Sequence, residues 1–68
     1  MQPTFSAEQI KEMCKEADFD YDSFKIMIEL IEEEIDLYNE EDLVILFEAS
    51  LIMVNRSLLN LSLKFMKS

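Results

Sequence analysis

The stretch LVILFEASLIMVNRSLLNLSLKFM, residues 43–66, carries apolar side chains at helical spacing along its whole length. Its main row steps forward by three or four residues, as one face of an α-helix does, and comprises Leu43, Phe47, Leu51, Val54, Leu58, Leu61 and Phe65. A second row steps by seven and comprises Ile45, Ile52, Leu59 and Met66. Two apolar rows are more than one contact face can cover. This helix must therefore lie between neighbours, pair with a second copy or receive a partner.

The boundaries of this helix are less sharply encoded than its faces. Asn39 is a good N-cap, and residues 40–42 are acidic, which suits the positive end of the helix dipole. Residues 55–57, Asn-Arg-Ser, could divide the stretch, but neither Pro nor Gly marks a stop. The sequence leaves open whether residues 40–67 form one helix or two.

An earlier helix begins after Ser6, which is placed as an N-cap with Gln9 completing a capping box. Phe5 and Ile10 are spaced as a hydrophobic staple around this start. The apolar stripe that follows comprises Ile10, Met13, Cys14 and Ala17, so we interpret Cys14 as a core residue. Residues 1–4 are predicted to be a frayed end.

Acidic and aromatic residues alternate from Asp18 to Ser23, which fits a connector between helices. Asp22 or Ser23 can cap the helix that follows. The apolar face of that helix comprises Phe24, Met27, Ile28, Ile31 and Ile35, and its opposite face is crowded with Glu29, Glu32, Glu33 and Glu34.

These patterns predict an all-α fold, in which residues 1–68 form a single domain. Short connectors favour a small antiparallel bundle of three to four helices. A chain of this size buries only roughly 60% of its unfolded surface, so its own core gives little stability. We expect a partner or self-association to add burial.

Composition excludes several classes of function. The chain has no Gly, which phosphate-binding loops require, and no His, the usual base and zinc ligand. Its formal net charge of −9 opposes direct nucleic-acid binding, which depends on Lys and Arg. We therefore predict a protein that is not an enzyme and has no cofactor.

Cys14 is the sole cysteine, which excludes an internal disulfide and favours an intracellular setting. No signal peptide is visible at the start of the sequence. The apolar run from Leu43 to Val54 is shorter than the roughly 20 residues that a membrane span needs. These features predict a cytoplasmic protein without a membrane span.

Asp18, Asp20 and Asp22 match the opening of a calcium loop, and Glu29 falls at its twelfth position. Ser23, however, occupies the position where the sharp turn of that loop requires Gly. We interpret the three aspartates as capping the start of the helix that follows and predict no metal site, with residual calcium binding left open.

Residues 6–20, SAEQIKEMCKEADFD, resemble the entering helix and first loop residues of a calmodulin-type EF-hand. Residues 19–28, FDYDSFKIMI, resemble the end of that loop and the exiting helix. The two matches overlap at Phe19 and Asp20, so most of the loop would be missing. The resemblance, confined to about the first 28 residues, implies a degenerate, calcium-independent hand like a single-lobe myosin light chain.

Two further resemblances involve other small regulators. Residues 28–35, IELIEEEI, are similar to the second helix of the sporulation checkpoint inhibitors of histidine kinases. Residues 22–29 and 39–43 are similar to the haemolysin-modulating partners of nucleoid proteins, although residues 51–53 replace the charged motif of that family.

The leading hypothesis is a non-enzymatic protein-binding module, in which an apolar groove receives a basic amphipathic helix of a protein partner. The predicted groove residues are Phe24, Met27, Ile31, Phe47, Leu51, Val54 and Leu58. The alternative is a small acidic inhibitor, bacterial or phage-like, of a kinase or a nucleic-acid-binding protein. A homodimer through the two apolar rows is a third possibility.

Overall fold

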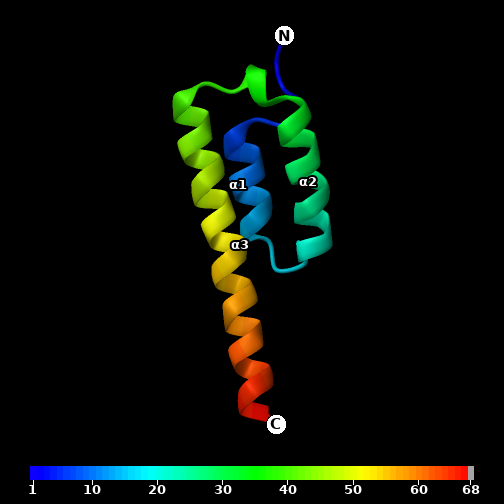
Figure 1. Ribbon diagram of the computed structural model, residues 1–68, viewed down its shortest axis with the longest axis vertical. Helices are drawn as coiled ribbons and strands as arrows, with labels where there is room; N and C mark the ends of the chain where they lie inside the picture. Colours follow the sequence, from blue (N-terminus) through cyan, green and yellow to red (C-terminus); the bar gives the residue numbers. More distant parts are fainter. Residues whose placement is uncertain (68) are drawn as a thin grey trace.

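In the computed structural model, which describes residues 1–67, three α-helices and one short 3₁₀ helix follow one another along the chain (Figure 1). Helix α1 spans Ala7–Lys15, α2 spans Tyr21–Glu33, the 3₁₀ helix η1 spans Ile35–Leu37, and α3 spans Glu40–Lys67. No strand occurs among these residues, and the predicted all-helical class is confirmed. Helices α1 and α3 run in the same direction, and α2 runs against them (Figure 1).

Helix α1 begins as the sequence predicts. The Ser6 hydroxyl accepts a hydrogen bond from the Gln9 backbone N–H at 3.1 Å, and the Gln9 side chain accepts one from the Ser6 N–H at 2.9 Å. These reciprocal bonds confirm the capping box, because each satisfies a backbone N–H that the first helical turn leaves unpaired.

Helix α2 begins earlier than predicted. Its N-cap is Asp20, whose carboxylate accepts the Ser23 backbone N–H at 2.8 Å. The prediction of Asp22 or Ser23 as the cap is wrong, because Tyr21 already takes helical geometry and Asp22 lies in the first turn. The connector between α1 and α2 is therefore only residues 16–20.

Helix α3 is a single helix of 28 residues, which answers the question left open by the sequence. It begins at a second reciprocal cap: the Asn39 side chain accepts the Asp42 N–H at 2.8 Å, and the Asp42 carboxylate accepts the Asn39 N–H at 3.1 Å. The predicted cap at Asn39 is confirmed. Residues 55–57 continue the helix without a break.

The core lies where α1 packs on α3, with α2 and Tyr38 closing one side. Cys14 is fully buried, which confirms its interpretation as a core residue. Ala17 is exposed because α1 ends before it. The buried cluster comprises Ala7, Ile10, Cys14, Phe24, Met27, Tyr38, Leu46, Ala49 and Met53.

The start of the chain is hydrogen-bonded to the region that joins α2 to α3. The Thr4 backbone N–H and hydroxyl donate to the Glu34 carboxylate at 3.0 and 2.8 Å. The buried Tyr38 hydroxyl donates to the Phe5 carbonyl at 2.8 Å. The prediction of a frayed end through Thr4 is therefore wrong at Thr4 itself.

The molecule is elongated, measuring 49 × 19 × 17 Å, because α3 extends well beyond α1 and α2 (Figure 1). Met53 is the last core residue of α3. Arg56, three residues further on, donates hydrogen bonds to the carbonyls of Cys14 and Phe19. All residues from 57 to 67 are exposed. We call residues 57–67 the overhang.

Candidate protein-binding surface

A pocket of about 290 Å³ lies between α2 and α3, and we call it the α2–α3 groove. Its volume is at the low end of the range for small-molecule sites. Apart from one carboxylate and one hydroxyl, its walls are apolar. The lining residues are Ile10, Phe24, Ile28, Ile31, Glu32, Leu43, Leu46, Phe47 and Ser50.

The groove exists because the apolar face of α2 is wider than its contact with the core. Phe24 and Leu46 are buried, at 5% and 8% exposure. Ile28 and Phe47 remain exposed at 36% and 64%. The groove therefore has a buried apolar base and an accessible apolar rim.

The structure divides the seven predicted groove residues into three groups. Phe24, Ile31 and Phe47 all line the α2–α3 groove. Met27 does not line it, and lies buried in the core. The other three are exposed on α3 beyond the groove: Leu51, Val54 and Leu58.

The main row of α3 faces solvent along its whole length. Its seven side chains keep between 42% (Leu43) and 80% (Phe65) of their surface exposed. Helix α3 instead turns a different row toward the core, made of Leu46, Ala49 and Met53. Leu43 and Phe47 belong both to the main row and to the groove, so the two apolar surfaces are continuous.

Several groove residues were missing from the prediction. Ile28 had a signal, because it belongs to the predicted apolar face of α2, and Leu43 begins the main row. Leu46 belongs to neither predicted row. Its spacing of three and four residues to Ala49 and Met53 could have identified a third apolar row. Ile10, Glu32 and Ser50 join the groove through tertiary contacts that periodicity does not encode.

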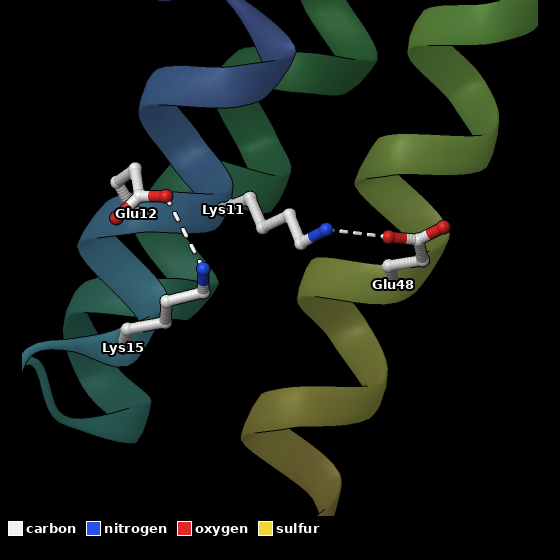
Figure 2. Close-up of polar contacts among 4 residues, drawn as sticks. All are labelled: Lys11, Glu12, Lys15 and Glu48. Carbon is white, nitrogen blue, oxygen red and sulfur yellow. Dashed lines mark hydrogen bonds and ion pairs between the residues drawn. The ribbon is translucent and has the colours of Figure 1, made fainter.

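Figure 2 shows two ion pairs, one between α1 and α3 and one within α1. The Lys11 ammonium donates to the Glu48 carboxylate at 2.6 Å and connects α1 to α3. This hydrogen bond, together with the negative charge of Glu48, raises the pKa of Lys11. Lys15 donates to Glu12 at 3.2 Å within the α1 region.

Arg56 is a structural residue that the sequence did not single out. Its guanidinium donates to the carbonyls of Phe19 and Cys14, both at 2.7 Å. These carbonyls lie at the end of α1 and in the connector after it, where helix geometry leaves acceptors unpaired. Arg56 thereby fixes the α1–α2 connector against α3.

Three of the four acids of the calcium-loop motif lie at the start of α2 or within it. Asp20 is engaged as the α2 cap, which lowers its carboxyl pKa through the Ser23 hydrogen bonds. Asp22 and Glu29 lie within α2. No group of three acidic, Cys or His side chains converges among residues 1–67. A complete EF-hand loop has 12 residues, whereas this connector has five.

Comparisons with known proteins place no family label on this surface. No family model matches the chain, and neither a curated protein nor a solved structure matches it. Within residues 1–67, no helix is long and apolar enough to cross a membrane.

Proposed function

We propose that this chain is a non-enzymatic protein-binding module that docks an amphipathic helix of a partner in the α2–α3 groove. The observation that carries the proposal is the continuity of the groove with the exposed main row of α3. From Leu43 to Phe65 this row is about 33 Å long, the length of several helical turns. An apolar rim of this kind can contact the apolar side chains that an amphipathic helix presents at every third or fourth residue.

The partner helix is expected to be basic. All 15 acidic residues lie at or before Glu48, in the part of the chain that forms the groove. Glu32 lines the groove itself, and is exposed. A surface of this charge attracts basic segments and speeds their encounter, and the effect weakens with salt.

Binding is proposed to be independent of calcium, as in a degenerate EF-hand that resembles a single-lobe light chain. Two features support calcium independence: the α1–α2 connector is short, and the Asp20 carboxylate is already used by the α2 backbone. The EF-hand relationship itself stays a hypothesis.

Fluorescence titration of a basic amphipathic helical peptide that carries one tryptophan tests the proposal. The chain has no Trp, so the emission reports only the peptide. We expect a saturable blue shift that is the same with calcium and with chelator, and that survives moderate salt.

The variant Phe47→Ala should weaken this binding while the fold persists, because Phe47 is exposed at the groove rim. Ile26→Ala is the matched control, since Ile26 is equally exposed on α2 but does not line the groove. A blue shift that is absent, or equally weakened by both variants, would refute the groove as the binding site.

A second candidate is an acidic inhibitor that contacts its target through carboxylates. Its support is the exposed row of Glu29, Glu32 and Glu33 on α2. Reversal of Glu29 and Glu33, which do not line the groove, distinguishes the two functions. An inhibitor would lose binding on this reversal, whereas a groove binder would lose little.

A further inference from the structure

The overhang has the chemistry that the proposed function demands of a partner. Residues 57–67 carry Lys64 and Lys67 and no acid, giving +2, whereas residues 1–56 carry 15 acids against four bases, giving −11. The overhang is also helical and exposes Leu58, Leu61 and Phe65 from the main row. It is therefore a basic helix with an exposed apolar row, attached to an acidic, grooved bundle.

We infer that the α2–α3 groove of one chain binds the overhang of a second copy, so that two chains pair antiparallel along their main rows. This inference rests on the proposed function, because it names the helix that the groove receives. The occupant is argued from charge complementarity and from the register of the main row.

The main row has nearly the same spacing in both directions from Val54. Leu43 and Phe65 lie 11 residues to either side of it, and Phe47 and Leu61 lie seven to either side. A two-fold axis beside Val54 therefore sets Leu61 of one copy against Phe47 of the other, and Phe65 against Leu43. Such an interface is isologous and closes on itself as a dimer.

The orientation follows from the charges. An antiparallel pair brings the basic overhang of each copy to the acidic start of α3 in the other. A parallel pair would set the acidic residues 40–42 of both copies side by side, which is unfavourable.

One ion pair is specified by this arrangement. Lys64 follows Leu46 by 18 residues, about five helical turns, so both lie on the same side of α3. Leu46 lines the groove together with Ile28 and Glu32 of α2. The two-fold axis keeps that side aligned in both copies, and Lys64 of the second copy thus meets Glu32 of the first.

Sedimentation equilibrium of the full chain over a range of concentrations tests the inference. We expect a monomer–dimer equilibrium, with Leu61→Glu weakening the dimer by about tenfold or more. Leu63→Glu is the matched control, because Leu63 is similarly exposed but lies on the opposite side of the overhang. Both side chains lie outside the core cluster, so circular dichroism should show an unchanged helical fold for both variants.

Charge reversal tests the specific pair. Lys64→Glu and Glu32→Lys should each weaken the dimer by about two- to fivefold, and the double variant should recover most of the loss. Lys67→Glu is the control, because Lys67 points away from the main row by its helical position.

A chain that is monomeric at every concentration overturns the inference. If that monomer still gives the blue shift with a basic peptide, the proposed function stands and only the second copy is refuted. A dimer whose affinity is unchanged by Leu61→Glu uses another surface. A dimer that is weakened by Leu61→Glu but unchanged by Glu32→Lys forms outside the groove. Either result also overturns the inference.

Discussion

Arg56 contributes to stability through backbone acceptors rather than through an ion pair with a carboxylate. Its two hydrogen bonds reach the carbonyls of Cys14 and Phe19 across the α1–α3 contact. The change Arg56→Met keeps much of the side-chain length and removes both donors. We expect a loss of about 2 kcal/mol in the free energy of unfolding, measured by urea denaturation.

Lys67→Met is the control for this substitution, because Lys67 is exposed at the end of α3. A change below about 0.5 kcal/mol is expected there, as for most surface sites. Equal effects of the two substitutions would contradict the assigned role of Arg56.

Cys14 should be chemically inert in the folded protein. Burial raises the pKa of its thiol, and the positive charge of Arg56 offsets only part of this effect. Because the thiolate is the reactive form, labelling by a disulfide reagent at neutral pH should be limited by opening of the fold. Labelling as fast in the native protein as in urea would show that Cys14 is accessible.

Among the helices, α1 should lose the most stability when its N-cap is removed. It spans nine residues yet supplies Ala7, Ile10 and Cys14 to the core. Ser6→Ala removes the acceptor for the Gln9 N–H, and should lower the free energy of unfolding by about 1 kcal/mol.

Ser57→Ala is the matched control, since Ser57 is exposed inside α3. Alanine has the higher helix propensity, so this change should be neutral or slightly stabilising. Urea denaturation of both variants compares the two sites, and the same sign for both changes would contradict the capping role of Ser6.

Helix starts were predictable where the signal is local. Each of the two reciprocal caps joins residues only three apart, Ser6 with Gln9 and Asn39 with Asp42, and both caps form. For α2 the predicted caps were Asp22 and Ser23, whereas the observed cap, Asp20, stands two residues before Asp22 and has the same carboxylate chemistry. Sequence could not select among them, because the choice depends on how far the chain must run before α2 reaches the core.

The orientation of α3 was not predictable from its periodicity. The main row is longer and more apolar than the row of Leu46, Ala49 and Met53, yet the shorter row faces the core. Ala49, at 1% exposure, suits close approach of α1, which larger side chains would prevent. Periodicity identifies the faces of a helix, whereas their partners are set by shape across the whole bundle.

For the whole molecule, alkaline pH should reduce stability. The folded state raises the pKa of Lys11, Cys14 and Tyr38, whose ordinary values are 10.5, 9.0 and 10.0. Above 9.0 the unfolded chain releases protons that the folded chain still holds, so the free energy of unfolding falls with rising pH. Urea denaturation below pH 9.0 and above pH 10.5 measures the change, and a rise in stability would contradict these pKa directions.

The elongated shape of the molecule connects its stability to the proposed function. A compact chain of this length has a radius of gyration of about 11 Å, whereas this molecule has 13.5 Å. The difference reflects an α3 that leaves the bundle with its main row exposed (Figure 1). Covering this row with another helix would add the burial that the small core lacks.

The most direct test of the α2–α3 groove as a helix-binding site is the emission of the variant Phe47→Trp. This tryptophan would be the sole one in the chain, and would stand at the groove rim. Its emission should shift to the blue as protein concentration rises, or when a basic amphipathic helix is added to the dilute protein. An emission that stays typical of a water-exposed indole under both conditions would contradict the account.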